Sequence, residues 1–517
     1  MNNTKPEGTT TITYFIYMAV IVSGMAVLAI ELLGTRLLAP FYGADLYLWS
    51  ALISVTLAAL SFGYAAGGRL ADRAPQITRL AFIQALAGLW IIAIPWLRTP
   101  LLTLLQTIDL RLGVLINAAV LFFPPLTLLG MVSPYALRLK ASSVEKVGTT
   151  AGNLYAVSTA ASVVAALATG FLLIPHIGVQ RLFLLTGALL VLSGGIGFAM
   201  QRRVIAALIS TIIATAIGAL LLTPTLIDQA NAQTGLIAVV PSAYADVRVV
   251  DQDSIRYLLI DGGSHSSVDL STGQSRMAYV NVLDLAKNYS SSPGRMLAIG
   301  LGGGSVVRNF VRDGWTVDAV EIDPVVTKMA QTYFGLSPAD AQVYEMDGRQ
   351  FLMTHHELYD VIVMDAYGSS FIPFHLVTQE AFELVRCRLR PDGILGVNLE
   401  CVGWHDPLVS SVTATIKQHF RHVIALPIAE PPDQFGNLVL LASDHPLDLE
   451  KEPPVPKDRF SPEYDRAHAW DNRFEPDLTG AQILTDDLNP VDTWSVRINR
   501  AARNILHTTL DVRGIAW

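Results

Sequence analysis

The stretch MLAIGLGGG, from Met296 to Gly304, joins a short apolar run to a turn rich in glycine. The apolar residues are typical of a buried strand, and Gly300, Gly302 and Gly304 would let the backbone pass close to a ligand. About nineteen residues after Gly302 comes Glu321, in the sequence VEIDP. A glycine turn followed by an acid at this spacing is typical of nucleotide binding. We therefore expect a nucleoside site that begins at this turn.

Further strand candidates follow the glycine turn, and each ends close to a carboxylate. Asp347 follows AQVYEM and Asp365 follows YDVIVM, with helical segments between the strands. Strands that alternate with helices indicate a doubly wound parallel sheet, in which ligands lie at the carboxyl ends of the strands. There Glu321 could accept from both ribose hydroxyls, Asp347 could accept from an adenine amino group, and Asp365 would lie beside the reacting centre.

The first part of the chain has a different composition. Of the 517 residues, 51% are hydrophobic and 15% are charged, whereas soluble domains carry about 25% charged residues. The apolar excess forms stretches near the length of about 20 residues that a helix needs to cross a bilayer. We count about seven, at 12–35, 47–68, 78–97, 112–137, 150–174, 182–200 and 204–223. The net charge of −8 gives no reason to expect a nucleic acid partner, and two cysteines do not make a disulfide framework.

Two ionisable residues, Glu31 and Arg36, interrupt the first apolar stretch in AIELLGTRLLAP. Charged groups in hydrocarbon are costly, so they tend to face the interior of a helix bundle and to serve a function. The alternative is that they form pairs that hold the helices together. We treat them as a candidate polar site of the membrane domain, although they identify no transported molecule.

The charges in the loops of this domain conflict with a cytoplasmic nucleoside site. Lysine and arginine concentrate in alternate loops, at Arg69, Arg73 and Arg79, at Arg138, Lys140 and Lys146, and at Arg202 and Arg203. The positive-inside rule places such loops in the cytoplasm. With seven spans, the residues after 224 would then lie outside, where cytosolic nucleosides are not available. We expect a multi-pass protein of the plasma (inner) membrane and leave the side of its catalytic domain open.

Two further segments complete the organisation. The runs ADVRVVDQ and RYLLIDGG alternate apolar and polar residues, which predicts short antiparallel strands. HPLDLEKEPPVPKDRFSPEYD, near the end, is rich in proline and charge, and predicts a surface segment that folds back as a lid. We divide the chain into a transmembrane helical domain at 1–224, a small β unit at 225–275, a Rossmann-like catalytic domain at 276–445 and a C-terminal tail or lid at 446–517.

Several motifs of the C-terminal part resemble one family. AIGLGGGSVVRNF, AVEIDP, MDGRQFL, YDVIVMDAY and LRPDGILGVN occur in this order. Together they resemble the spermidine synthase family, the polyamine aminopropyltransferases. ELLGTRLLAPFYG, FIPFHLVTQEAF and ILTDDLNP further resemble its membrane-fused branch, which has an N-terminal multi-pass helical domain. The fold implied is an α-helical membrane bundle of about seven spans, followed by an α/β Rossmann-like methyltransferase/spermidine-synthase fold with a small N-terminal β unit.

The resemblance also implies roles for individual residues. Asp365 would be the hydrogen-bond acceptor or base for the attacking amine, with Tyr279 as a second catalytic residue. The donor would be bound by Gly300, Gly302, Gly304, Glu321, Asp347 and Gly348. That donor is S-adenosylmethionine or its decarboxylated form, and no metal is implied. The partners would be an amine acceptor, in particular a polyamine, and the lipid bilayer, without nucleic acid, and we also consider a homodimer.

The sequence departs from the family at four polar positions. Ser305 stands where the family has an aspartate that pairs with the aminopropyl ammonium, and Gly368 where it has a second aspartate that grips the diamine. His265 replaces a glutamine, and Asn281 replaces a glutamate. An acid at 305 would repel the carboxylate of intact S-adenosylmethionine, so its absence favours, slightly, N-methyl transfer. Aminopropyl transfer from the decarboxylated donor is the alternative, and a nucleoside-regulated polyamine transporter or sensor without turnover is a third.

An amine site could be rebuilt from other residues. The candidates are Tyr367, His375, Glu400, Asp486 and Asp487. The last two lie in ILTDDLNP, which the tail would deliver to the strand ends if it folds back as a lid. Each candidate also has an ordinary interpretation, as a capping acid, a solvated loop residue or a hydrogen-bonded core histidine.

Overall fold

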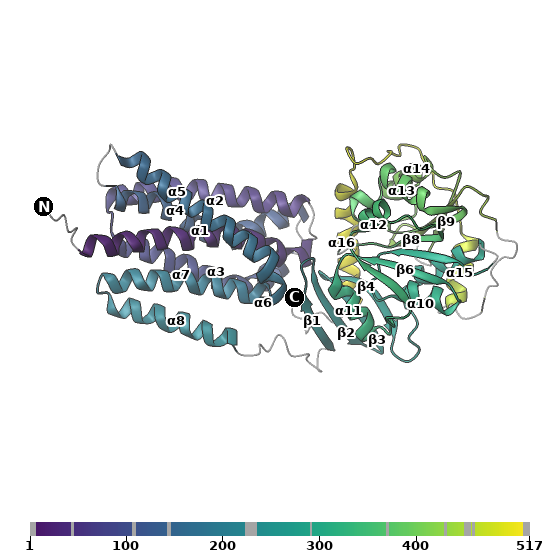
Figure 1. Cartoon of the computed structure of the whole chain (residues 1–517), viewed down its shortest axis with the longest axis horizontal. Coiled ribbons are helices and arrows are strands. Elements are labelled where there is room, and N and C mark those ends of the chain that lie inside the picture. Colours follow the sequence, from purple (N-terminus) through teal and green to yellow (C-terminus); the bar gives the residue numbers. More distant parts are fainter. Residues whose placement is uncertain are drawn as a thin grey trace. The chain divides into compact units, whose positions relative to one another are not determined.

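The computed structural model describes residues 7–42, 46–105, 110–141, 146–222, 235–289, 292–368, 372–428, 432–448, 456 and 461–509. The chain divides into two compact units, Met1–Gln229 and Ala230–Trp517. The first is helical and the second combines helices with two sheets (Figure 1).

Long helices form the N-terminal unit, and every predicted apolar stretch is helical over its described residues. They are α1 (Glu7–Tyr42), α2 (Leu46–Arg73), α3 (Ile77–Leu105), α4 (Leu110–Lys140), α5 (Val147–Ala168) with a π-helical turn (Thr169–Leu173) and α6 (Ile174–Ile177), α7 (Val179–Met200) and α8 (Val204–Leu222). By length and composition, six of the described helices could cross a membrane. The expected seventh span is represented by a shorter apolar helix over Val204–Gly218.

Glycines bring α2 and α4 into close contact. A Cβ atom on Gly63 would lie 2.3 Å from the carbonyl oxygen of Thr127, and one on Gly67 would lie 2.6 Å from the Cα of Met131. Small residues are used in this way where membrane helices pack backbone to backbone. The contact leaves no room for a larger residue at either glycine.

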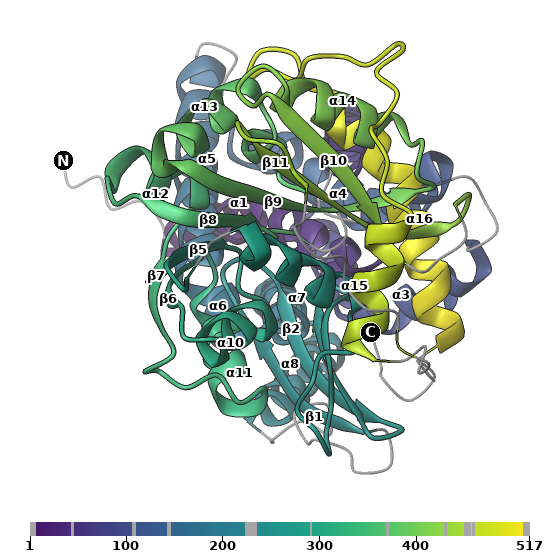
Figure 2. The ribbon, with the colours of Figure 1, turned by 90° about the vertical axis from the view of Figure 1, so that its right-hand side faces the viewer.

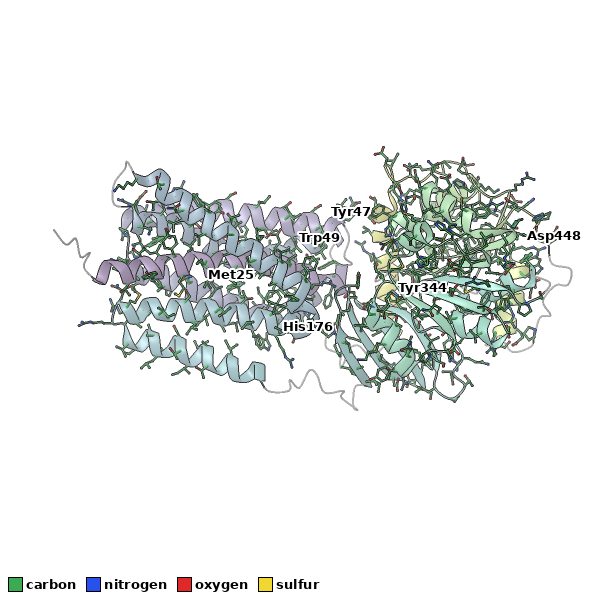
Figure 3. The ribbon with its side chains drawn as sticks, viewed as in Figure 1. Met25, Tyr47, Trp49, His176, Tyr344 and Asp448 are labelled. Atoms are coloured by element: carbon green, nitrogen blue, oxygen red, sulfur yellow. The ribbon has the colours of Figure 1, made fainter. Side chains whose placement is uncertain are left out.

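Buried polar side chains connect other helices of the bundle. The amide of Gln84 in α3 donates to Ser23 of α1 at 3.2 Å and accepts from Ser193 of α7 at 3.0 Å. Near the start of α2, which Figure 3 marks by Tyr47 and Trp49, the guanidinium of Arg111 lies 4.9 Å from the centre of the Tyr47 ring. These contacts tie helices together where apolar packing alone gives little direction.

The C-terminal unit opens with an antiparallel sheet of four strands in the order β1-β2-β3-β4. They are β1 (Leu236–Pro241), β2 (Asp246–Gln252), β3 (Ile255–Ile260) and β4 (Gly263–Asp269). Asp261 and Gly262 have positive φ angles, 44° and 76°, in the turn from β3 to β4. The glycine of IDGG thus allows a tight return, and β4 runs back beside the neighbouring sheet.

The second sheet has seven strands in the order β10-β11-β9-β8-β5-β6-β7. They are β5 (Arg295–Ile299), β6 (Thr316–Glu321), β7 (Ala341–Glu345), β8 (Tyr359–Met364), β9 (Leu389–Val402), β10 (His422–Pro427) and β11 (Phe435–Ser443). β5 to β9 are parallel, whereas β10 and β11 are antiparallel to their neighbours. After β5 the chain builds β6 and β7 on one side and β8 and β9 on the other. Ligands bind in such sheets at the carboxyl ends of the strands where the order reverses, which here means beside β5 and β8.

Helices cover both faces of this sheet (Figure 2). They are α9 (Ala278–Leu283) with a 3-10 turn (Asp284–Tyr289), α10 (Ser305–Arg312), α11 (Pro324–Tyr333), α12 (Gly348–Thr354), a 3-10 turn (Phe374–Leu376), α13 (Gln379–Arg388) and α14 (Pro407–Ile416). One buried core contains residues of α12, α13 and α14, and the other contains residues of α9 and α10. Tyr344 of β7, labelled in Figure 3, packs on Phe351 of α12 with ring centres 4.9 Å apart.

Parts of the tail belong to these two cores. The tail contains α15 (Pro462–Asp471) and α16 (Val491–Thr509). Trp470 of α15 is buried in the core beside α9, and Leu484 and Val491 are buried in the core beside α13 and α14. Most of the predicted surface segment, at 449–455 and 457–460, lies outside the described residues, and the part of the tail that follows it is fastened to the domain by buried apolar residues.

Candidate active site

The glycine turn after β5 forms the floor of the site. Gly300, Gly302 and Gly304 have φ angles of 95°, 51° and 74°, which side chains rarely tolerate. A Cβ on Gly300 would lie 2.2 Å from the carbonyl oxygen of Asp365, so only glycine fits between the ends of β5 and β8. The side chain of Ser266 in β4 accepts from the backbone N–H of Gly303 at 2.7 Å. The four-stranded sheet thus fixes the glycine turn through Ser266 of β4.

Glu321 lies at the end of β6, beside the turn. Its two carboxylate oxygens accept from the backbone N–H groups of Leu301 at 3.2 Å and Asp323 at 3.0 Å. Burial raises the pKa of Glu321 to about 7, and the two backbone hydrogen bonds act in the opposite direction. Each oxygen keeps a second lone pair, so the group can still accept from a ribose hydroxyl.

Asp365 follows β8 and is held by two side chains. Its Oδ1 accepts from the amide of Asn398 at 2.8 Å, and its Oδ2 accepts from the hydroxyl of Tyr279 at 3.1 Å. Asn398 in turn accepts from Asn437 at 3.1 Å, so strands β8, β9 and β11 fix one carboxylate. Burial raises the pKa of Asp365 to about 6, and the hydrogen bonds from Asn398 and Tyr279 lower it.

A second acid, Glu400, stands beside Asp365. It is two residues after Asn398 on β9, and residues two apart in a strand point to the same face. Its Oε2 atom is buried and has no hydrogen-bond partner among the described residues. Burial, and then the charge of Asp365, raises the pKa of Glu400 to about 8. The hydroxyl of Tyr367 lies next to it, donating to the carbonyl of Asn398 at 2.9 Å and accepting from the backbone N–H of Glu400 at 2.8 Å.

Asp347 precedes α12 at the end of β7. One oxygen caps the helix by accepting from Gln350 N–H at 3.0 Å, and the other lies 2.9 Å from Nε2 of His375. The contact with His375 lowers the pKa of Asp347. A Cβ on Gly348 would lie 2.4 Å from a side-chain carbon of Ile299, the last residue of β5, so Asp347 and the glycine turn are close neighbours.

Polar atoms near the start of α10 lack partners. Ser305, the first residue of α10, is 7% exposed, and its hydroxyl makes no hydrogen bond within the described part of the chain. On β4, the hydroxyl of Ser264 is likewise buried without a hydrogen bond to the described residues. An unsatisfied buried polar atom is costly unless something binds it. These atoms could therefore hold a polar group of a ligand above the turn.

The structure brings most of the predicted site residues together, but it separates others. Asp365, Tyr279, Tyr367 and Glu400 form one group around the end of β8. His375 lies with Asp347, and Asp486 is bonded to Arg349 at 2.6 Å. Asp487 is exposed, with no hydrogen bond or ion pair in the described residues. Glu31 and Arg36 lie in α1 of the other unit.

Sequence reasoning missed Asn398, Arg349 and Ser266, which support the residues of this site. Asn398 orients Asp365, and its signal is the alternation of Asn398 and Glu400 in GVNLE. Arg349 connects the tail to Asp347 and His375, and it was visible only as part of MDGRQFL. In the described residues, no group of three His, Cys, Asp or Glu side chains has the arrangement of a metal site.

Comparisons with known proteins match this region. Residues 278–446 match the family model of the spermine/spermidine synthase domain. A probable polyamine aminopropyl transferase of Bifidobacterium longum is 33% identical over 170 residues, which are 32% of this chain and 34% of that protein. The spermidine synthase of Schizosaccharomyces pombe is 27% identical over 232 residues, 43% of this chain and 75% of that protein. This chain thus spans about a third of the length of the first relative and three quarters of the second.

A methyltransferase also shares part of the region. The eEF1A lysine and N-terminal methyltransferase of Homo sapiens is 33% identical over 140 residues, 24% of this chain and 20% of that protein. A crystal structure of a probable spermidine synthase from Corynebacterium glutamicum aligns with a TM-score of 0.38 and 19% identity, over 52% of this chain and 94% of that chain. Residues 278–446 therefore match a spermine/spermidine synthase domain, and over this region the chain is similar to polyamine aminopropyltransferases and to a methyltransferase.

Proposed function

We propose that the chain is a membrane-bound transferase that moves an alkyl group from an adenosyl sulfonium donor to an amine. The observation that carries this proposal is the position of Asp365. It lies at the carboxyl end of β8, against the glycine turn, and is fixed by Tyr279 and Asn398. A carboxylate in this place can orient an amine toward a donor that lies over the turn.

The transfer needs little covalent chemistry from the protein. The lone pair of a neutral amine nitrogen attacks the carbon next to the sulfonium, and a nitrogen–carbon bond forms as the carbon–sulfur bond breaks. The electron pair of the broken bond stays on sulfur, which becomes a neutral thioether, and the positive charge passes to nitrogen. Asp365 accepts the proton that the amine releases and passes it to water. Its pKa of about 6 leaves it mostly ionised at pH 7.

Two neighbouring acids favour an acceptor with more than one amino group. Glu400 stands beside Asp365, with one carboxylate oxygen that no described residue contacts. An ammonium group bound between them would lower the cost of ionising Glu400, because an opposite charge favours the ionised form. We therefore favour a polyamine, in which one amino group reacts and another is held by Glu400.

The donor favoured is intact S-adenosylmethionine, and the reaction N-methyl transfer. The hydroxyl of Ser305 is buried without a described partner at the start of α10, where helix N–H groups favour a negative charge. A carboxylate of the donor suits this position better than an ammonium group does. With methyl as the transferred group, the amino acid part of the donor stays on sulfur after transfer.

Aminopropyl transfer is the second candidate. The relatives from Bifidobacterium longum and Schizosaccharomyces pombe carry names of aminopropyltransferases and spermidine synthases. A decarboxylated donor would present only an ammonium group to Ser305, whose hydroxyl oxygen can accept hydrogen bonds but offers no negative charge. The third candidate, a polyamine transporter or sensor that binds the nucleoside without turnover, draws its support from Glu31 and Arg36 in α1.

Replacing Asp365 by Asn separates an enzyme from a sensor. The change keeps the size of the side chain and its bond to Tyr279 but removes the acceptor of the proton. We expect product formation from S-adenosylmethionine and spermidine, followed by mass spectrometry, to fall by about 100-fold or more. Binding of the donor should stay close to that of the unmodified protein.

Glu383→Gln is the matched control, because Glu383 is an exposed acid on α13 without a hydrogen bond or ion pair to the described residues. It should keep full activity. Donor binding without product in the unmodified protein would favour the sensor or transporter, and equal activity of Asp365→Asn and Glu383→Gln would rule out the role given to Asp365.

A further inference from the structure

One segment of the tail is fastened to the loop before α13. The segment is residues 484–489, here called the tail turn. The carbonyl of Leu484 accepts from Gln379 N–H at 2.8 Å, and its N–H donates to Thr415 at 2.9 Å. At the other end, the amide of Asn489 donates to the carbonyl of Phe374 at 3.0 Å. The tail turn is therefore anchored on both sides of the 3-10 turn that carries His375.

Asp486, in the middle of the tail turn, makes a two-pronged ion pair. Its carboxylate oxygens lie 2.6 Å from the two terminal nitrogens of Arg349. One of those nitrogens also donates to the carbonyl of His375 at 3.1 Å. Paired hydrogen bonds between a guanidinium and a carboxylate fix both distance and orientation. The backbone of His375 is thus held in place by an arginine that the tail orients.

The contacts continue from His375 to the nucleoside end of the site. Nε2 of His375 lies 2.9 Å from one oxygen of Asp347, whose other oxygen caps α12. Asp347 is the residue next to Gly348, which packs directly on the last residue of β5. A continuous series of contacts therefore leads from Asp486 through Arg349 and His375 to the carboxylate beside the glycine turn.

We propose that Asp486 and Arg349 are positioning residues for the nucleoside part of the donor, so that the tail turn completes the donor side of the site. This inference rests on the proposed function, and it differs from the expectation that Asp486 contacts the amine. With the tail turn in place, the loop carrying His375 is held against Asp347, and the carboxylate keeps one orientation toward the adenine edge.

A role in positioning agrees with the exposure of the ion pair. The side chain of Asp486 is 45% exposed and that of Arg349 is 19% exposed. Ion pairs at the surface contribute little to the stability of a fold. The pair can therefore be broken with little effect on folding, while the freedom of the His375 loop increases. The adjacent Asp487 is exposed as well, without a described hydrogen bond or ion pair, and provides a control at the next residue.

The test is equilibrium binding of two ligands to the full-length protein in detergent, by titration calorimetry. One ligand is S-adenosylmethionine, and the other is 5′-methylthioadenosine, which has the nucleoside but no amino acid part. Asp486→Asn should weaken both ligands by about tenfold, the effect of one lost charge-assisted hydrogen bond. Asp487→Asn should bind both as the unmodified protein does. The exchanged pair, Arg349→Asp with Asp486→Arg, should recover part of the loss.

The unfolding midpoint, the KM for the amine and the affinities of the two ligands together distinguish positioning from a general structural effect. The unfolding midpoint of Asp486→Asn should match that of Asp487→Asn, and where activity is measured, KM for the amine should not change. Equal affinities of Asp486→Asn and Asp487→Asn would overturn the inference. So would a loss for S-adenosylmethionine alone, because the amino acid end would then be the part affected. If the unmodified protein binds neither ligand, the proposed function itself falls.

Discussion

The two carboxylates at the reacting centre, Asp365 and Glu400, have different pKa values because their surroundings differ. Asp365 receives hydrogen bonds from Asn398 and Tyr279, whereas Glu400 receives none from described residues at its buried oxygen. Burial therefore raises the pKa of Asp365 to about 6 and that of Glu400 to about 8. At neutral pH Asp365 is mostly ionised and can accept a proton, whereas Glu400 becomes ionised when a cation binds beside it.

The raised pKa of Glu400 predicts how stability changes with pH. A carboxyl whose pKa is higher in the folded chain stabilises the fold at pH values below its ordinary pKa, and this contribution is lost as pH rises through the folded value. For Glu400 the window runs from its ordinary 4.5 to about 8. The unfolding midpoint of the ligand-free protein should fall across this window. Glu400→Gln should show a smaller fall, and Glu383→Gln should follow the unmodified protein.

Activity should depend on pH in the opposite direction. The proton of the amine is accepted by ionised Asp365, so kcat/KM should rise as pH increases through about 6. The measurement is the rate at saturating donor between pH 5 and pH 8. Each rate is corrected for the fraction of the amine that is neutral at that pH. A rate that stays constant across pH 6 after this correction would contradict the assignment of Asp365.

Ser305 is the residue that should decide between donors. In Ser305→Asp, a new carboxylate would repel the carboxylate of intact S-adenosylmethionine and attract the ammonium of the decarboxylated form. We expect affinity for the intact donor to fall by about tenfold and affinity for the decarboxylated donor to rise. Ser305→Ala controls for loss of the hydroxyl. A variant that still prefers the intact donor by the original ratio would show that the donor tail lies elsewhere.

Sequence patterns located the strand-end residues better than the residues that support them. Glu321, Asp347 and Asp365 were predicted at strand ends, and in the structure Glu321 is the last residue of β6, Asp347 lies two residues after β7 and Asp365 directly follows β8. Asn398 and Ser266 were missed, because their roles come from strands that meet only in the folded sheet. Asp486 was predicted as a candidate for the amine site, and its ion pair with Arg349 was not foreseen, since an acid in a tail carries no information about the arginine it meets.

Among the elements, the tail differs most from what composition suggests. Its proline and charge predicted a surface segment at 445–465, and later in the tail Leu484, Val491 and Ile498 are at most 1% exposed and lie in the main core. These residues are widely spaced, so no local periodicity marks them as buried. Earlier in the chain, by contrast, continuous apolar runs mark the strands of the parallel sheet directly.

The buried tail residue Leu484 gives a prediction about stability, and Leu488, four residues later, provides its control. Leu484 is 0% exposed and Leu488 is 66% exposed, in the same turn of the tail. Leu484→Ala should lower the free energy of unfolding by about 3 kcal/mol, because a buried cavity is left. Leu488→Ala should change it by less than about 0.5 kcal/mol. Chemical unfolding followed by Trp fluorescence measures both, and equal effects would mean that the tail is not part of the core.

At the scale of the whole molecule, the two units have different candidate roles. The C-terminal unit carries the candidate active site, and the helical unit contains six described helices that are long and apolar enough to cross a membrane. Helix α8 packs back along α7, since a Cβ on Gly195 would lie 2.8 Å from the Cβ of Ser210. Hydropathy predicted these helices, whereas the basic loops and the supply of the proposed donor favour opposite sides of a membrane for the C-terminal unit.

The free cysteines allow the side to be measured. Cys387 is exposed on α13 and Cys401 is buried on β9. Because the proposed donor is made in the cytoplasm, Cys387 should react with a membrane-impermeant maleimide only after the membrane is opened. Cys401 should react only after unfolding. Labelling of Cys387 in intact cells would instead agree with the basic loops and contradict a cytosolic donor.

The most direct measurement of the central claim is the mass of the product. Full-length protein in detergent is incubated with spermidine or putrescine and with either intact or decarboxylated S-adenosylmethionine. We predict a gain of one methyl group by the amine, with the intact donor and not with the decarboxylated one, and its loss in Asp365→Asn. A gain of one aminopropyl group from the decarboxylated donor would contradict the role given to Ser305, and donor binding without any new product would contradict a transferase.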